Sequence, residues 1–385
     1  MSHSASTQHI SGRLFARAGL LVLAILFVSA GTTPVFAQYV RTDLVSNQNG
    51  GGANVPDQNL VNAWGLTALP FTPFWVSDNG TGLSTLYDGL GNNQMLNVTI
   101  PAAPGSPAGT AGTPTGTVSN LSLLTPNPVF NFTVPGAASP QPAIFIFATL
   151  DGTIVAWNPN LDPVSNTTPA LSTATTVADR SAAHASYTGL AIAQDAAGNF
   201  FLFAADGGPN RNIDIFGQGA SGDFTFLRSV SDPAIPKGFT PYGIQSIHNH
   251  VWVTFTALNK AQGGFVDVFD ADGNLTRHDA AHGPLHSPWG MALAPPDFGP
   301  MSNAILISNN IAHGRINAFN PKTGEFLGPL RDANNNPIEI DNVWALQFGQ
   351  DGAGNLNGAH NQLFFTGGPN HYANGIFGVV NFVAK

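Results

Sequence analysis

Six short stretches of the chain carry the side chains best suited to holding a ligand. Each places a small neutral polar residue three positions before a glycine (an alanine in the last stretch) and a Trp, Tyr or Thr one position before it. The polar residues are Asn62, Thr113, Ser186, Thr240, Ser287 and Asn342, and the residues next to the glycine or alanine are Trp64, Thr115, Thr188, Tyr242, Trp289 and Trp344. Uncharged hydrogen-bonding groups beside aromatic rings suit stacking on a sugar or another neutral ring.

The pattern offers little to a divalent cation. Asp341 adjoins Asn342, but no Asp or Glu occupies the matching place in the other five stretches, and a hard cation needs several oxygen ligands with negative charge among them. The segment Asp270-Ala271-Asp272-Gly273-Asn274 resembles a calcium loop, yet Leu275 stands where an EF-hand requires glycine. We therefore predict a hairpin turn there, no metal ligand and no cofactor.

Histidine could supply a transition-metal site, because His278, His282 and His286 are spaced four apart like ligands on a helix. Gly283-Pro284 would break such a helix, so we expect these side chains to lie in loops. There is no Gly-x-Ser-x-Gly nucleophile turn, no His-Glu-x-x-His motif and no cysteine. No catalytic residue is assigned.

The elements that position these residues repeat six times. After each stretch comes an apolar strand, then a polar turn, then a further strand that ends in an aromatic residue. These aromatic residues are Tyr87, Trp157, Phe216, Phe269, Phe319 and Phe377. The stretches recur every 47 to 73 residues, a spacing typical of repeated β-units.

Short strands, tight turns and six repeats predict an all-β, six-bladed β-propeller. Glycine in each inner strand permits blades to crowd the axis, and the aromatic residues of the third strands fill the gaps between blades. The segment 39–45 precedes the first repeat, and we predict that it pairs with the last blade and closes the ring. Polar turns at Asp78-Asn79, Asp151, Asp206, Asn309-Asn310 and Asn370 are expected to bond local backbone.

In a propeller the six stretches meet at the mouth of the central channel. We therefore predict a ligand site there, made of Asn62, Trp64, Ser186, Thr240, Tyr242, Ser287, Trp289, Asn342 and Trp344. The alternative is structural: the polar groups cap strand ends, and the aromatic rings pack between blades.

Three runs resemble an uncharacterised family of secreted bacterial β-propellers, several of which carry C-terminal sorting signals. The runs are Asn59-Leu60-Val61-Asn62-Ala63-Trp64-Gly65-Leu66, Phe74-Trp75-Val76-Ser77-Asp78-Asn79-Gly80 and Gly283-Pro284-Leu285-His286-Ser287-Pro288-Trp289-Gly290. More distantly, the blades are similar to NHL-type repeats. The resemblance implies a six-bladed fold and no particular activity.

The first 37 residues read as a signal peptide. Arg13 and Arg17 precede the apolar run Leu20–Val28, and Val35-Phe36-Ala37 forms a small-residue cleavage site. We expect a secreted or periplasmic protein in which residues 38–385 form one propeller domain, with long loop insertions at 101–142 and 162–180.

Composition limits the partners. Only 9% of residues are charged and the net charge is −9, so nucleic acid is excluded and no membrane association is expected after signal removal. A closed propeller needs no partner to cover its edges, so a monomer is expected. The leading hypothesis is a non-enzymatic propeller that binds a neutral small molecule, a glycan or a protein. The alternatives are a divalent-metal-dependent hydrolase or lactonase, and a structural protein of an extracellular matrix or surface.

Overall fold

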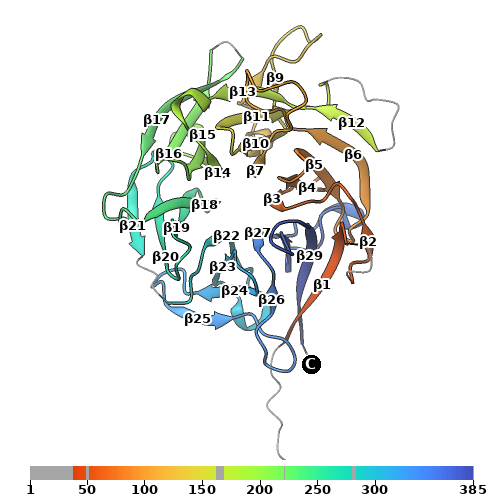
Figure 1. The fold of residues 1–385 in the computed structure, drawn as a ribbon, viewed down its shortest axis with the longest axis vertical. Coiled ribbons are helices and arrows are strands. Elements are labelled where there is room, and N and C mark those ends of the chain that lie inside the picture. The colour runs from red at the N-terminus through yellow and green to blue at the C-terminus, as the bar shows by residue number, and fades with distance from the viewer. Residues whose placement is uncertain (1–37, 49–51, 162–168, 221, 280–282, 385) are drawn as a thin grey trace, which may run out of the picture. The chain divides into compact units, whose positions relative to one another are not determined.

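Six β-sheets stand around one axis as the blades of a propeller (Figure 1). The structure is a computed structural model that describes residues 38–48, 52–161, 169–220, 222–279 and 283–384. The predicted all-β, six-bladed fold is confirmed. The described residues contain no α-helix, and their 3-10 turns are η1 (Leu121–Leu124), η2 (Ser181–Ala183), η3 (Gly299–Met301) and η4 (Ala353–Asn355).

Blades 1 to 3 come from the first half of the domain, and their strands are given from the axis outward. Blade 1 contains β3 (Ala63–Thr67), β4 (Phe74–Asp78), β5 (Leu83–Tyr87), β6 (Asn93–Thr99) and β12 (Ala170–Thr173). Blade 2 contains β7 (Pro114–Ser119), β10 (Phe145–Thr149), β11 (Thr153–Trp157) and β13 (Thr175–Asp179). Blade 3 contains β14 (Tyr187–Gln194), β15 (Phe200–Asp206), β16 (Ile213–Gln218) and β17 (Phe224–Val230).

Blades 4 to 6 complete the ring. Blade 4 contains β18 (Phe239–Ile247), β19 (His250–Ala257), β20 (Gly264–Phe269) and β21 (Leu275–Asp279). Blade 5 contains β22 (Pro288–Leu293), β23 (Ile305–Asn309), β24 (Gly314–Phe319) and β25 (Phe326–Pro329), with β26 (Glu339–Ile340) also paired to β24. Blade 6 contains β27 (Val343–Phe348), β28 (Gln362–Gly367), β29 (Ile376–Val383), β1 (Gln38–Ser46) and β2 (Val55–Pro56).

The ring closes as predicted, with the two ends of the domain in one blade. Strand β1 runs antiparallel to β29, from the pair Gln38–Val383 to the pair Ser46–Ile376. Tyr39 adds a tie to blade 5, because its hydroxyl donates to the carbonyl of Phe298 at 2.8 Å and accepts the amide of Met301 at 3.0 Å. This pairing covers the edge that β29 would otherwise expose.

The insertion predicted as a loop at 162–180 differs from the expectation in its second half. Residues 170–179 form β12, which runs parallel to β6 of blade 1, and β13, which is the outer strand of blade 2. The Thr and Val residues of this segment favour extended structure. The edges of two sheets, at β6 of blade 1 and β11 of blade 2, were available as hydrogen-bonding partners. The insertion at 101–142 is mostly irregular, apart from β7, η1 and the small hairpin of β8 (Asn131–Phe132) and β9 (Gln141–Pro142).

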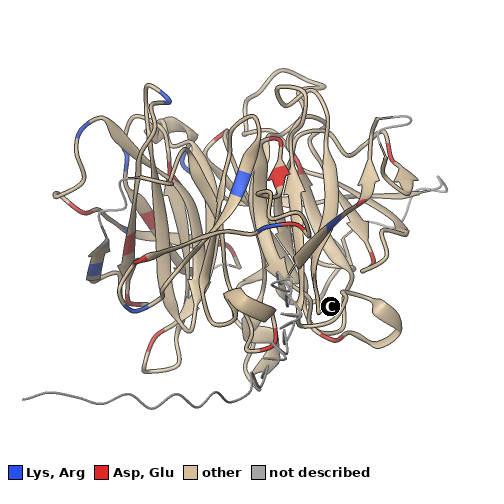
Figure 2. Cartoon of the chain, turned by 90° about the horizontal axis from the view of Figure 1, so that it is seen from below, with Lys and Arg blue, Asp and Glu red and all other residues tan. Residues whose placement is uncertain are grey.

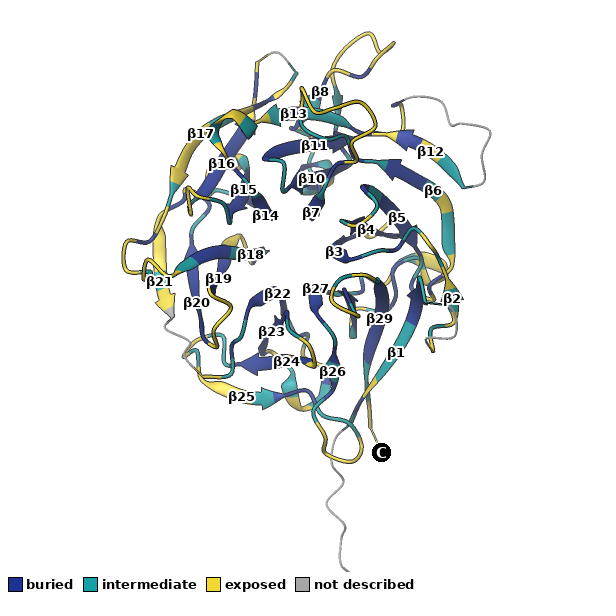
Figure 3. Ribbon diagram, in the orientation of Figure 1, coloured by how far each residue is buried: buried dark blue, intermediate teal, exposed yellow. Residues whose placement is uncertain are grey.

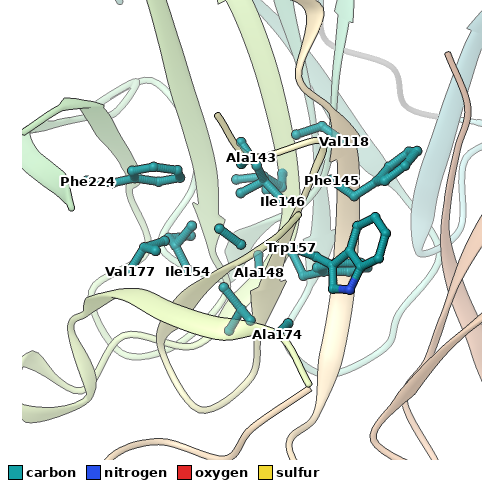
Figure 4. Close-up of a cluster of buried hydrophobic side chains, with 14 of the residues drawn as sticks. Val118, Ala143, Phe145, Ile146, Ala148, Ile154, Trp157, Ala174, Val177 and Phe224 are labelled. Atoms are coloured by element: carbon teal, nitrogen blue, oxygen red, sulfur yellow. The ribbon is translucent and has the colours of Figure 1, made fainter. Parts of the chain in front are cut away.

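Burial decreases from the axis to the rim, so the inner strands are dark in Figure 3, while the outer strands β17, β21 and β25 carry much exposed surface and β12 and β13 are of mixed burial. The aromatic residues of the third strands fill the gaps between blades as predicted. Trp157, at the end of the third strand of blade 2, lies 4.6 Å from the ring of Trp75 of blade 1, which in turn stacks on Phe145 of blade 2 at 4.1 Å. Figure 4 shows Phe145 and Trp157 within this cluster of buried side chains. These contacts bury apolar surface between blades 1 and 2.

Charged side chains are sparse and of mixed sign over the view in Figure 2. No helix in the described part of the chain is long and apolar enough to cross a membrane. The predicted signal peptide, residues 1–37, lies outside the described residues.

Candidate functional site

The inner strands begin with an irregularity that releases side chains from the sheet. In blades 1, 5 and 6 the polar residue before the strand has left-handed backbone, with φ of 48° at Asn62, 48° at Ser287 and 49° at Asn342. The register between first and second strands then shifts, as between Ala63 and Leu66. A bulge of this kind leaves residues unpaired and re-aims their side chains. The two asparagines suit the position because Asn tolerates left-handed backbone.

Glycine in the inner strand brings the next blade close, as predicted. A Cβ atom at Gly243 would overlap the carbonyl oxygen of Trp289, and a Cβ at Gly290 would overlap that of Trp344. These glycines are therefore required by the approach of the neighbouring blade.

Second-strand hydroxyls, which the sequence analysis missed, fix the carbonyl groups of the axial tryptophans. Ser308 Oγ accepts the amide of Gly290 at 2.8 Å and donates to the carbonyl of Trp344 at 2.7 Å. Thr366 Oγ1 likewise accepts the amide of Ala345 and donates to the carbonyl of Trp64. Each hydroxyl joins its own blade to the next one, so the backbone that carries the tryptophans is held from both sides.

The aromatic residues gather at the axis and pack on one another. Trp64 and Trp344 stack with ring centroids 3.7 Å apart and planes 21° apart, and Trp289 meets both rings edge-on at 6.1 and 5.6 Å. Tyr242 and Tyr372 each lie 5.7 Å from Trp344. We call these five residues the axial aromatic cluster.

The three indole N–H groups of this cluster differ in their hydrogen-bond acceptors. Trp344 donates to Oδ1 of Asn62 at 3.1 Å, and Trp289 donates to the carbonyl of Thr188 at 2.9 Å. Nε1 of Trp64 is buried and has no hydrogen-bond partner among the described residues. A buried donor without an acceptor is costly, so this N–H is the unsatisfied group of the cluster.

A cavity of about 490 Å³ lies over the cluster, and we call it the mouth cavity. Seven of the nine predicted site residues line it: Asn62, Trp64, Thr240, Tyr242, Ser287, Asn342 and Trp344. Ser186 and Trp289 do not. The amide of Ser186 instead donates to Oδ1 of Asp206 at 2.9 Å, and Trp289 lines a separate small cavity deeper in the channel.

Several lining residues were not predicted as site residues. They come from the loops that follow the second strands and from the start of blade 5, and include Lys260, His286, Asn310, His371 and Tyr372. Oδ1 of Asn310 accepts the hydroxyls of Tyr372 at 2.9 Å and Tyr242 at 3.4 Å. Burial raises the pKa of both tyrosines, so both hydroxyls keep their protons and act as donors. The sequence had marked Asn310 only as a turn residue.

The lining contains one lysine and two histidines, and none of the described lining residues is Asp or Glu. Neutral oxygens and nitrogens, aromatic faces and the ammonium group of Lys260 can hold an uncharged or anionic ligand. They do not make a carboxylate site for a hard divalent cation.

The predicted bonding of local backbone by the polar turns holds for Asp206, whose Oδ1 accepts the amide of Gly208 at 2.9 Å, but is wrong for Asp151 and Asn309, whose backbone partners lie 38 and 23 residues earlier in the chain. Oδ2 of Asp151 accepts the amide of Thr113 at 3.2 Å, and Oδ1 of Asn309 accepts that of His286 at 3.2 Å. The segment Asp270–Asn274 is a hairpin turn, in which Oδ1 of Asp270 accepts the amides of Asp272 and Asn274 at 3.0 and 2.8 Å.

Comparison with known proteins corrects the family expectation. The chain is similar to "Uncharacterized protein R648" of Acanthamoeba polyphaga mimivirus, with 26% identity over 317 residues that cover 79% of this chain and 72% of that protein. It is also 27% identical over 314 residues to "Uncharacterized protein L690" of the same virus, covering 79% and 77%. These relatives are viral, so the expected membership of a bacterial family is wrong. No known family model matches the chain.

Solved structures with a similar arrangement include a streptogramin B lyase, which is 12% identical, covers 90% of this chain and 97% of that chain, and has a TM-score of 0.45. Another is a catalytically inactive virginiamycin B lyase from Staphylococcus aureus with quinupristin, at 10% identity, coverage of 90% and 99%, and a TM-score of 0.46. Likeness at this level assigns no activity to the chain.

Proposed function

We propose that the protein is a non-enzymatic propeller that binds a saccharide-like small ligand in the mouth cavity. The observation that carries this proposal is the indole N–H of Trp64, a buried donor without a partner in a residue that lines the cavity. Because this N–H is buried, the proposal requires that a hydroxyl or ring oxygen of the ligand reach it from the cavity and accept its hydrogen bond. The volume of about 490 Å³ lies within the range of small-molecule sites.

The lining chemistry supports a sugar ring, neutral or acidic. Tyr242 and Tyr372 offer aromatic rings and hydroxyl oxygens that can accept, since their protons are donated to Asn310, and the side chains of Asn342 and Ser287 add further polar groups. Because the ammonium group of Lys260 can pair with a carboxylate, we widen the expected ligand class from neutral sugars to acidic ones. Metal-dependent hydrolysis is less well supported, since none of the described lining residues offers a carboxylate to an ion.

Binding is tested with a matched pair of tryptophan variants. A glycan array with neutral and uronic or sialic acid sugars identifies a ligand, and calorimetry then compares Trp64→Phe with Trp289→Phe. Both variants remove an indole N–H from the axial aromatic cluster. Trp64→Phe removes the donor that has no partner, so we expect affinity to fall about 5-fold or more. Trp289→Phe removes a bond already made within the protein, so we expect lower stability with affinity retained.

Lysine variants test the charge of the ligand. We expect Lys260→Met to weaken binding of acidic sugars only, and Lys322→Met, which removes an exposed lysine from the turn after β24, to change nothing. Equal effects of Trp64→Phe and Trp289→Phe on affinity would contradict the proposal. So would the absence of any array signal, or turnover of a panel of lactones and esters.

Export is part of the proposal. Cleavage after Ala37 would leave β1 complete, since that strand spans Gln38–Ser46. Mass spectrometry of protein recovered from the medium of a secreting host checks this: a chain starting at Gln38 is expected, and an intact N-terminus in the cell fraction would contradict it.

A further inference from the structure

A second cluster of polar side chains lies in blade 4, on the outer strands and the loop before β18. Asp267 belongs to β20 and Asp232 to that loop, while His278 lies in β21 and not in a loop as expected from the sequence; His282 lies outside the described residues. Nδ1 of His278 lies 2.7 Å from Oδ1 of Asp267 and 2.8 Å from Oδ2 of Asp232. One candidate ligand atom from each residue lies within 4.8 Å of the others.

The local structure holds these side chains in place. Oδ1 of Asp232 accepts the amide of Ala234 at 2.8 Å, which leaves its second oxygen for the cluster. The ring of His278 stacks against that of Phe265 at 5.8 Å. Asp267 is fully buried and pairs across the sheet with His278.

Charge and hydrogen bonding in the cluster are incomplete. A single N–H on Nδ1 cannot donate in line to both carboxylates, and the second oxygen of the buried Asp267 has no partner among the described residues. Arg277, the residue before His278, places its guanidinium 4.7 Å from the centre of the Trp252 ring and donates to the carbonyl of Pro321 at 2.7 Å.

The matching carboxylate of blade 3 shows what complete compensation looks like. Asp214 accepts the hydroxyl of Tyr187 at 2.7 Å and that of Ser229 at 2.6 Å, and Arg180 lies 3.6 Å away. Blade 4 replaces this set with a histidine and a second carboxylate. Imidazole and carboxylate groups are common metal ligands, whereas the hydroxyl and guanidinium groups at the matching place in blade 3 are not.

We propose that Asp232, Asp267 and His278 bind one divalent transition-metal ion of the Zn²⁺ class. One imidazole nitrogen and two carboxylates are ligands that zinc accepts in a tetrahedral site, with water in the fourth position. Zinc holds its ligand atoms about 3.3 Å apart, so it would replace the Nδ1 proton with shifts of about 0.5 Å. A site with a histidine ligand is a poor one for Ca²⁺ and Mg²⁺, because these ions prefer oxygen ligands. This site is independent of the function proposed for the mouth cavity.

The test measures zinc in the purified, untagged protein. After equilibration with ZnCl₂ and dialysis, elemental analysis compares the wild type with His278→Gln and Asp267→Asn. We expect each variant to retain one zinc fewer per chain than the wild type. We also expect zinc, but not CaCl₂, to raise the melting temperature of the wild type and not that of His278→Gln, with EDTA reversing the rise.

A surface variant controls for adventitious binding. His360 is exposed and contacts Asp351 at 2.8 Å and Asp297 at 3.1 Å, which is a similar combination of one imidazole and two carboxylates on the surface. His360→Gln removes the imidazole from this surface group. We expect it to keep the zinc-dependent rise in melting temperature. Melting in EDTA shows whether His278→Gln is folded; equal zinc content in the wild type and a folded His278→Gln protein would overturn the proposal.

Discussion

The indole N–H of Trp344 donates to Oδ1 of Asn62 at 3.1 Å, across 282 residues of sequence. The side-chain amide of Asn62 in turn donates to Oδ1 of Asn79 at 3.2 Å, and that of Asn79 to the carbonyl of Pro114 at 3.2 Å. This chain of hydrogen bonds joins blades 6, 1 and 2 at the axis, beside the mouth cavity. One asparagine thus helps to close the ring and to line the proposed site.

Replacing Asn62 by Ala should destabilise the protein. The change leaves the Trp344 N–H without an acceptor and puts Ala at a left-handed φ of 48°, so we expect a loss of about 2–4 kcal/mol in the free energy of unfolding. Urea unfolding measures it. Asn62→Gly, which adopts this φ freely, separates the hydrogen bond from the backbone strain; an unchanged midpoint for Asn62→Ala would show that the bond contributes nothing.

Gly290→Ala should be among the most damaging single-methyl changes. The new Cβ would meet the carbonyl oxygen of Trp344, and backbone cannot move aside as a flexible side chain can. We expect a loss of about 3 kcal/mol or more, or failure to fold. Gly238→Ala is the matched control, since no heavy atom lies within 4 Å of its added Cβ. Thermal melting of both variants decides; similar melting temperatures would refute the steric argument.

Removal of residues 38–46 should open the ring. Without β1, strand β29 loses its antiparallel partner along the whole register. We expect a markedly lower melting temperature and a tendency to self-associate through the exposed edge, measured by calorimetry and light scattering.

Tyr39→Phe provides a graded version of that change. It keeps the strand but removes both hydrogen bonds of the hydroxyl, so about 1–2 kcal/mol should be lost. A truncated protein that melts like the full domain would contradict the closure.

Asp78 should make stability depend on pH. Burial raises the pKa of this carboxyl well above its usual value, and the charge of Asp57 raises it further. The folded state therefore keeps a proton that the unfolded chain releases above about pH 4, and the free energy of unfolding falls as pH rises from there towards the folded-state pKa. Asp78→Asn removes this slope, so the variant should gain stability over the wild type between pH 5 and pH 8.

Asp195 serves as a control, because its pKa is shifted in the opposite direction to that of Asp78. Hydrogen bonds from Asn199 lower the pKa of the exposed Asp195, so Asp195→Asn should lose stability only above that pKa. Urea unfolding at several pH values measures both variants. A constant difference between Asp78→Asn and the wild type would mean that Asp78 is ionised in the folded state.

Much of the architecture could be predicted from the sequence because each blade repeats the same local signals. Glycine, or alanine in the last repeat, before an apolar strand and an aromatic residue at the end of the third strand recur six times, and a closed ring of sheets buries these residues. The strands of 170–179 were missed because their partners, β6 and β11, are edges that exist only once two blades have formed.

The nine predicted binding residues show where sequence reasoning ends. Their types and spacing placed them at the axis, and seven of them line the mouth cavity. Only the tertiary structure decides that Trp289 packs below the cavity, that the N–H of Trp64 is left without an acceptor, and that Asp232 meets His278. Those relationships depend on side-chain directions and on contacts between blades far apart in the chain, and a repeat that is equal in every blade carries no information about how its copies differ.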